Sequence, residues 1–200
     1  MIPRSLPLGV LAVLLTALPA QAAEWSKPAA VRNGAKTIVR FRARIAGDFL
    51  VVEAAHAPGW HSYAMDNEQR AAEKRNGKAS LGVEQGVHIE VDSGGKLVGP
   101  WYQSPPHDLS QPDIQWFTWG FDETATFAHR LERSGDGPVR LKIGGQICDG
   151  KSCRPIDLEL TVPSSNDESQ PEFSTDALVP VRTETTTDSP TPPSSRDSQP

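Results

Sequence analysis

The fold class of this chain is decided by the stretch Val39-Arg40-Phe41-Arg42-Ala43-Arg44-Ile45, in which apolar residues alternate with arginines. Alternation with period two places successive side chains on opposite faces of a strand, so the stretch predicts a strand with one buried and one solvated face. Phe49-Leu50-Val51-Val52 follows after the break Ala46-Gly47-Asp48. This sequence predicts a hairpin whose second strand is more deeply buried.

Four further segments alternate in the same way, residues 87–91, 125–131, 139–143 and 156–162. Gly, Pro and Asp residues separate them, as is typical of turns between short strands. About six or seven short strands with almost no helix favour an all-β domain, and we expect an antiparallel β-sandwich.

Two segments of the body lack this alternation. A short helix is expected at residues 66–74, where Asp66 can cap the first turn. The stretch 99–120 holds several prolines among its Trp, Tyr and Phe residues, so we expect a long aromatic loop region there. Loops of this length are usually functional or disordered, and the aromatic content favours a function.

The N-terminal end has the composition of a secretory signal. Arg4 supplies a positive start, an apolar run extends from Leu6 to Leu18, and Ala20-Gln21-Ala22 has the pattern of a cleavage site. The apolar run is too short, and too broken by proline, to span a membrane. We therefore expect residues 1–23 to be removed, and the mature protein to be periplasmic or secreted with no direct membrane span.

The C-terminal end, residues 164–200, is rich in Ser, Thr and Pro and has Phe173 as its only aromatic residue. Such a segment buries too little surface to offset its conformational entropy, so we expect it to be disordered. It carries seven acidic residues against Arg182 and Arg196, which accounts for the whole net charge of −5. The body, residues 24–163, is thus neutral and large enough for one core. A neutral body disfavours nucleic acid as a partner.

The chain has 2 Cys, Cys148 and Cys153, which enclose the turn-forming sequence Asp149-Gly150-Lys151-Ser152. Because strands are predicted on both sides, the cysteines lie at opposing positions of a hairpin and within disulfide reach. Counting by twos along both strands directs both sulfurs away from the core. A bulge at Gly144-Gly145 would invert the first count.

Three interpretations of this pair stay open from spacing alone. A disulfide that closes about six residues stabilises by roughly 2 kcal/mol, which makes it a modest structural bond. Lys151 and Arg154 favour the thiolate and therefore exchange, whereas Asp149 opposes them. Metal binding is the third, since His61, Met65 and a cysteine offer the soft ligands that copper prefers.

Three motifs follow one another along the chain: Pro58-Gly59-Trp60-His61-Ser62-Tyr63, Trp119-Gly120-Phe121-Asp122-Glu123-Thr124-Ala125-Thr126-Phe127, and Gly145-Gln146-Ile147-Cys148-x4-Cys153-x-Pro155. In this order they resemble the N-terminal periplasmic domain of the thiol:disulfide interchange protein DsbD, over roughly residues 35–163. The resemblance implies an immunoglobulin-like sandwich whose two cysteines alternate between dithiol and disulfide. It also implies a thioredoxin-like thiol protein as electron donor and an exported thiol protein as acceptor.

Carried over by position, the resemblance makes Cys148 and Cys153 the catalytic pair and requires no cofactor and no metal. It places His61 and Tyr63 beside the sulfurs. It makes residues 116–121 a cap that shields the disulfide, with Phe117, Trp119 and Phe121 among its aromatic residues. The cap here lacks the acidic residues that can adjust cysteine pKa values in the family, and Ile156 stands where a second proline would follow Pro155.

The sequence shows neither an eight-helix membrane portion nor a thioredoxin-like Cys-x-x-Cys domain, so the resemblance implies a detached module supplied by separate proteins. One alternative is a non-enzymatic interaction module, in which the disulfide only holds the hairpin and the aromatic loops bind a partner. A periplasmic copper-binding protein is a further alternative. Motifs for phosphate loops, hydrolase elbows and zinc proteases are absent.

Overall fold

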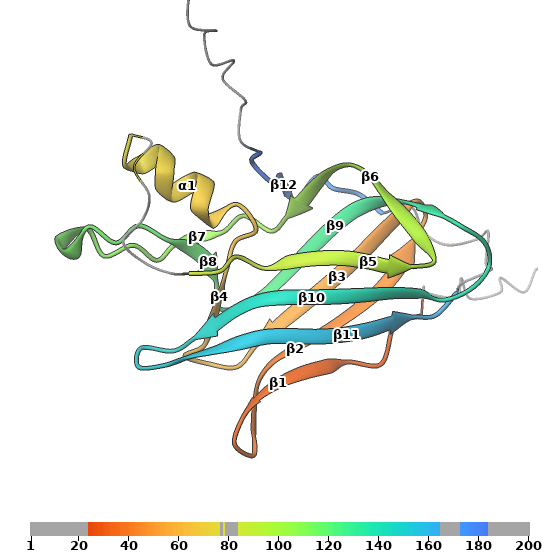
Figure 1. Ribbon diagram of the computed structural model, residues 1–200, viewed down its shortest axis with the longest axis horizontal. Helices are drawn as coiled ribbons and strands as arrows, with labels where there is room; N and C mark the ends of the chain where they lie inside the picture. Colours follow the sequence, from red (N-terminus) through yellow and green to blue (C-terminus); the bar gives the residue numbers. More distant parts are fainter. Residues whose placement is uncertain (1–23, 77, 79–83, 165–172, 184–200) are drawn as a thin grey trace, which may run out of the picture.

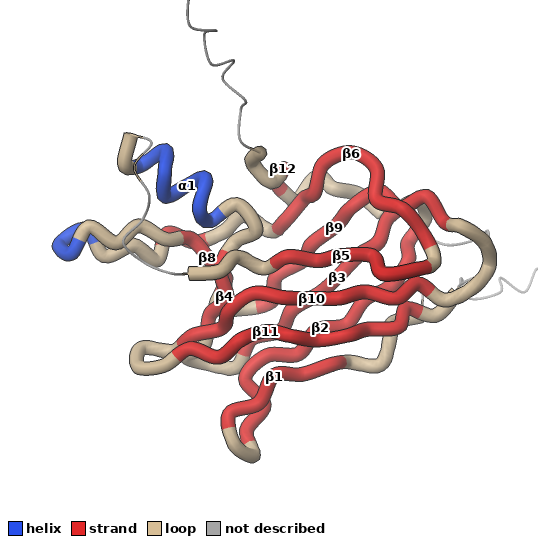
Figure 2. The backbone as a smooth tube through the Cα atoms, viewed as in Figure 1, coloured by secondary structure: helices blue, strands red, loops and turns tan. Residues whose placement is uncertain are grey.

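The computed structural model describes residues 24–76, 78, 84–164 and 173–183. The expected signal peptide, residues 1–23, lies outside the described residues, as do 165–172 and 184–200 of the expected disordered tail. Two sheets of antiparallel strands pack face to face, which confirms the predicted all-β class and the antiparallel sandwich (Figure 1). Strands dominate the described chain (Figure 2). None of its helices is long and apolar enough to cross a membrane.

The first sheet has the order β1 (Ala29–Asn33), β2 (Lys36–Ala46), β3 (Phe49–His56), β9 (Thr124–Arg133), β6 (Gly95–Gln103) and β12 (Val179–Pro180). The alternating stretch that decides the fold lies in β2, where Phe41 is buried and Arg40 and Arg42 are exposed. The predicted hairpin joins β2 to β3. Gly47 makes its turn with a φ of 56°, a conformation that costs glycine little because it has no Cβ.

The second sheet has the order β11 (Cys153–Val162), β10 (Val139–Cys148), β4 (His61–Tyr63), β8 (Trp119–Phe121) and β7 (His107–Asp108), and β5 (His88–Ser93) also pairs with β10. On this side of β10, β5 pairs with residues 140–144 and β4 pairs with residues 147–148. Between them, a Cβ on Gly145 would lie 2.9 Å from the carbonyl oxygen of Gly86. A glycine therefore lets the chain that leads into β5 approach β10 closely.

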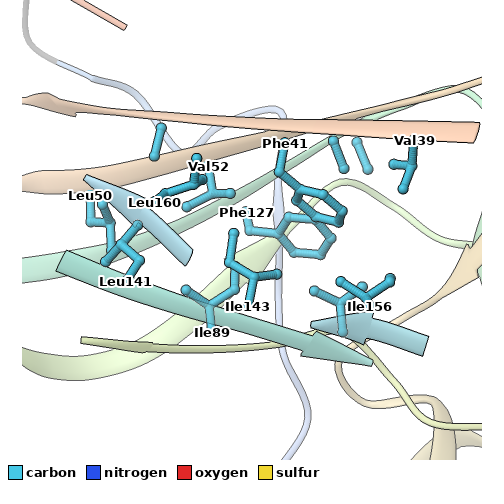
Figure 3. Close-up of a cluster of buried hydrophobic side chains, with 14 of the residues drawn as sticks. Val39, Phe41, Leu50, Val52, Ile89, Phe127, Leu141, Ile143, Ile156 and Leu160 are labelled. Atoms are coloured by element: carbon cyan, nitrogen blue, oxygen red, sulfur yellow. The ribbon is translucent and has the colours of Figure 1, made fainter. Parts of the chain in front are cut away.

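The core lies between the two sheets, as Figure 3 shows. Phe41 and Phe127 of the first sheet and Ile143 and Ile156 of the second belong to one buried cluster, and none of the four is more than 3% exposed. Burying apolar surface stabilises a fold by about 25 cal/mol per Å². Because β10 and β11 both contribute to this core, the core anchors the hairpin that ends at Cys148 and Cys153.

The helix expected at residues 66–74 is present as α1 (Asn67–Lys74). The Asp66 side chain makes no capping bond to it. Instead, Asp66 Oδ1 accepts hydrogen bonds from Arg70 Nε at 2.8 Å and from Gln103 Nε2 at 2.6 Å. The start of α1 is therefore tied to the end of β6.

The long loop expected over residues 99–120 is wrong at both ends, because 99–103 belong to β6 and 119–120 to β8. Pairing of β6 with β9 shifts register between Leu97 and Trp101, and this irregularity contains a glycine and a proline that hide the strand pattern. Between β7 and β8 the chain forms a short 3₁₀ turn, η1 (Pro112–Ile114). The middle of the stretch is thus a hairpin with a turned tip.

The disorder expected over residues 164–200 does not hold for residues 173–183, which we call the C-terminal strap. The ring of Phe173 lies 5.5 Å from that of Phe49 at the start of β3. Further along, Val179 and Pro180 form β12 and pair with Gln103 and Tyr102 of β6. Composition did not reveal this segment because a few main-chain bonds and one ring contact hold it, rather than an apolar face.

Candidate redox site at the Cys148–Cys153 hairpin

Cys148 and Cys153 are directly paired at the end of the β10–β11 hairpin and form a disulfide, with their Cα atoms 4.0 Å apart. Asp149 organises the turn between them, since its Oδ1 accepts hydrogen bonds from the backbone amides of Lys151 at 2.8 Å and Ser152 at 2.7 Å. These two bonds lower the pKa of the Asp149 carboxyl below its ordinary value. A carboxylate therefore stands beside the sulfurs at neutral pH.

The two cysteines differ in accessibility. Pairing between β10 and β11 is unbroken from Val139 to Cys148, so no bulge inverts the count along β10. Ile147 lies in the core cluster and its neighbour Cys148 does not, which places the disulfide on the face turned away from the core. Cys148 is nevertheless only 2% exposed, whereas Cys153 is exposed. Of the two cysteines, Cys153 is thus the one that solvent reaches.

The structure places His61 opposite Cys148, and Tyr63 against His61. His61 pairs with Cys148 across β4 and β10, and its ring makes an edge contact with the Tyr63 ring at 5.4 Å. Burial lowers the pKa of His61, although the charges of Asp122 and Asp149 act to raise it. Burial, helped by the charge of a nearby glutamate, raises the pKa of Tyr63 to about 12. Both rings are therefore neutral at pH 7, and His61 is the one that lies opposite Cys148.

A second histidine, His56, contacts β4 next to His61, and no sequence motif pointed to it. His56 Nδ1 contacts the carbonyl oxygen of Glu123, and its Nε2 lies 2.8 Å from Ser62 Oγ. Since a carbonyl can only accept, Nδ1 carries the proton and the Ser62 hydroxyl donates to Nε2. Burial is the largest cause that lowers the pKa of His56.

A signal for this contact exists in the sequence. Pro58-Gly59 occupies the central positions of a tight turn in which the Trp60 amide donates to the Ala57 carbonyl at 3.0 Å, and Gly59 has a φ of 82°. Proline followed by glycine is typical of such a type II turn. The turn folds His56 back onto the strand that carries His61.

The aromatic segment 116–121 splits between two roles. Phe121 lies in the core, with its ring 5.5 Å from that of Phe127 in an edge contact, so it does not act as a mobile cover. Trp119 is half-buried against the core, and Phe117 is half-buried just before β8. The Trp116 indole donates to the Glu84 carboxylate. Outside β8 the segment is held by side-chain hydrogen bonds, since the buried Thr118 hydroxyl donates to Asn67 Oδ1 at 3.0 Å.

An open cavity of about 590 Å³ lies beside His61. The imidazoles of His56 and His61, the carboxylates of Asp122 and Glu123, and the Trp60 indole contribute to its lining. Within the described ranges, no group of three or more His, Cys, Asp or Glu side chains is arranged to hold a metal ion. The lining of the cavity thus presents hydrogen-bonding residues next to His61.

Comparison with known proteins supports the fold. The chain is similar in fold to the N-terminal periplasmic domain of ScsB from Proteus mirabilis. The two are 16% identical with a TM-score of 0.50, and the match covers 73% of this chain and 55% of that domain. The chain thus spans about half the length of the structure it matches. No family model and no curated protein matches the sequence.

Two further solved structures are similar at lower scores. The N-terminal domain of Neisseria meningitidis DsbD, in the reduced form, is 17% identical with a TM-score of 0.43, and the match covers 62% of this chain and 83% of that one. The GAE domain of GGA2p from Saccharomyces cerevisiae is 9% identical with a TM-score of 0.36, covering 70% and 100%. The DsbD N-terminal domain, whose family the sequence motifs resemble, is thus among the solved structures that the comparison found.

Proposed function

We propose that residues 24–163 form an exported thiol–disulfide exchange domain that uses Cys148 and Cys153 as its redox pair. The observation that carries this proposal is the position of the disulfide. It lies at a strand-paired hairpin tip, outside the core cluster, with Cys153 open to solvent and Cys148 covered. A buried core disulfide would have no route for an attacking thiolate.

The exchange follows from this asymmetry. A thiolate of a reduced partner attacks Sγ of Cys153, a new S–S bond joins the two proteins, and the Cys148 sulfur leaves as a thiolate and takes up a proton. The second thiolate of the partner then attacks the partner's sulfur in the mixed disulfide. This step closes the partner's disulfide and releases Cys153 as a thiolate, which takes up a proton. The partner is oxidised to a disulfide, and this domain is reduced to a dithiol by two electrons. Reversal of these steps reduces an acceptor.

The donor that we propose is a thioredoxin-like thiol protein, and the acceptor is an exported thiol protein. Support comes from the sequence motifs that resemble the DsbD family and from the fold shared with a periplasmic domain. The composition of residues 1–23 supports export. The open cavity lined by His61, the strand partner of Cys148, gives the chain of a partner a place to lie on this side of the hairpin.

A second candidate is an interaction module in which the disulfide is only structural. Ile114 favours it, since this residue at the tip of the β7–β8 hairpin is 60% exposed and is the one large apolar side chain exposed among the described residues. In that case the disulfide contributes about 2 kcal/mol, because it closes a short ring. Replacing both cysteines by serine then lowers stability slightly and leaves partner binding intact.

The deciding experiment is the reduction potential of the pair in the folded protein. The protein is equilibrated in glutathione or dithiothreitol buffers, alkylated and weighed by mass spectrometry, with and without catalytic reduced thioredoxin. We expect a potential above about −300 mV and faster equilibration with thioredoxin. The double Cys148→Ser, Cys153→Ser variant is the control for unspecific alkylation. A bond that is reduced only in urea would refute the exchange function and leave the interaction module.

A further inference from the structure

The C-terminal strap ends on a buried carboxylate. The backbone amide of Arg182 donates a hydrogen bond to Asp66 Oδ2 at 3.0 Å, and the side chain of Asp66 is fully buried. One residue earlier, the Val181 amide donates to the Trp101 carbonyl at 2.8 Å. The Arg182 side chain also pairs with Glu73 of α1. This ion pair is exposed, and exposed pairs contribute little.

Asp66 is the centre of a small buried network. Its Oδ1 accepts from Arg70 and Gln103, while its Oδ2 receives the strap. Gln103 in turn accepts from the Met65 amide through Oε1 at 3.0 Å. A buried carboxylate that loses one of its donors is costly, because the charge stays behind without compensation. The strap thus completes a network that fixes the chain just after β4.

The next residue carries the connection to the redox site. Asn67 Oδ1 accepts hydrogen bonds from the Trp119 amide at 2.7 Å and from the Thr118 hydroxyl at 3.0 Å. Trp119 starts β8, and β8 pairs with β4. The first residue of β4 is His61, the partner of Cys148. Hydrogen bonds joined by short stretches of backbone therefore run from the strap through Asp66 and Asn67 to β8 and β4. We call these two paired strands, which flank Cys148, the β4–β8 wall.

We infer that the Arg182 amide and Asp66 are positioning groups of the redox site, and that the docked strap holds the β4–β8 wall against Cys148. When the strap leaves, Asp66 loses a donor, residues 65–67 loosen, and the wall gives way around Cys148, whose sulfur must depart as a thiolate when Cys153 is attacked. This inference rests on the proposed exchange function for its effect on chemistry. Its structural part, the coupling between the strap and Trp119, stands independently of that function.

One pair of variants isolates the hydrogen bond. Arg182→Pro removes the amide proton that reaches Asp66, because proline has no N–H. Arg182→Ala keeps the amide and removes only the side chain and its ion pair with Glu73. Both changes are made in the full chain with the disulfide formed. Three quantities are measured: amide exchange at Val181, amide exchange at Trp119 by NMR, and the rate of reduction by glutathione.

We expect Arg182→Pro to accelerate amide exchange at Val181 and Trp119 by about tenfold, the scale of a lost hydrogen bond to a charged group, and to accelerate reduction several-fold. Arg182→Ala stays within about twofold of the parent protein for all three. If Arg182→Pro accelerates exchange at Val181 but matches Arg182→Ala at Trp119, the coupling does not exist and the inference is overturned. If glutathione fails to reduce the folded parent protein, the exchange function fails, and exchange at Trp119 alone decides the coupling.

Discussion

His61 lies directly opposite Cys148 in the β4–β10 pair, while Cys153 lies opposite Cys148 on the other side, in β11. Cys148 is therefore flanked by a strand on each side. Cys153 belongs to the outermost strand of its sheet in the strand order. This placement explains why the two sulfurs of one bond differ so strongly in exposure.

Single cysteine variants should show this difference. In Cys148→Ser the remaining Cys153 thiol is exposed, whereas in Cys153→Ser the remaining Cys148 thiol is covered. We expect a chromogenic disulfide reagent to react several-fold faster with Cys148→Ser when both proteins are folded, because access limits the covered thiol. Measured in urea, the two rates should converge. Equal rates in the folded proteins would contradict the assigned order of attack.

Phe121 and Phe117 are neighbours in the aromatic segment but should respond differently to truncation. Phe121 is 4% exposed and contacts Phe127, so Phe121→Ala should lower the free energy of unfolding by about 3–5 kcal/mol. Phe117 is half-buried, and Phe117→Ala should cost about 1 kcal/mol. Urea unfolding curves measure both. Similar losses in the two variants would place Phe117 in the core as well.

The pH dependence of the free energy of unfolding should reflect the titration of His56. Burial lowers its pKa in the folded state below the ordinary value of 6.5, so the unfolded chain binds more protons between those two pKa values. Stability is therefore complete above about pH 6.5 and declines as the pH falls below it. His61 acts in the same direction, whereas Asp66, whose pKa is also lowered, acts only below its ordinary value of 3.8.

Urea unfolding at several pH values between 7.5 and about 5 measures this decline. His56→Gln removes one of the two histidines whose pKa is lowered, so its stability should fall less steeply over the same range. A variant with the same slope as the parent protein would mean that His56 titrates alike in the folded and unfolded chains.

Gly120 of β8 pairs with Tyr63 of β4 and has no room for a side chain. A Cβ there would lie 2.2 Å from the carbonyl oxygen of Ser62, which is backbone and cannot turn aside. Gly120→Ala should therefore cost about 1–3 kcal/mol and speed reduction of the disulfide. Gly137→Ala is the matched control, since a Cβ there meets nothing within 4 Å, and it should stay within about 0.5 kcal/mol. Thermal unfolding of the pair separates the two cases.

Long strands were predictable because their alternation is a local property. The pattern identified β2, β10 and β11, and from the last two it also gave the pairing of Cys148 with Cys153. β4 and β8 contain three residues each, too few for alternation to be recognised. These two strands form the wall of the site, so alternation predicted the framework of the redox pair, whereas only the family resemblance pointed to residues of the wall.

The strap was missed for a different reason. Its order comes from single contacts with distant residues, such as the Arg182 amide with Asp66, 116 residues apart in sequence. Composition averages over a segment and records none of these. The contact of His56 with Ser62 was missed in a similar way, although the Pro58-Gly59 turn between them is visible in the sequence.

The position of β12 also bears on how this protein behaves at high concentration. Beyond β9, the first sheet would end at β6, and an open strand edge is a template on which another chain can add. β12 covers the end of that edge, at Tyr102 and Gln103, with two residues, one of them Pro180, which has no amide proton to offer to a further strand. A protein shortened before residue 173 should therefore tend to self-associate through β6, even if its core and its disulfide are intact.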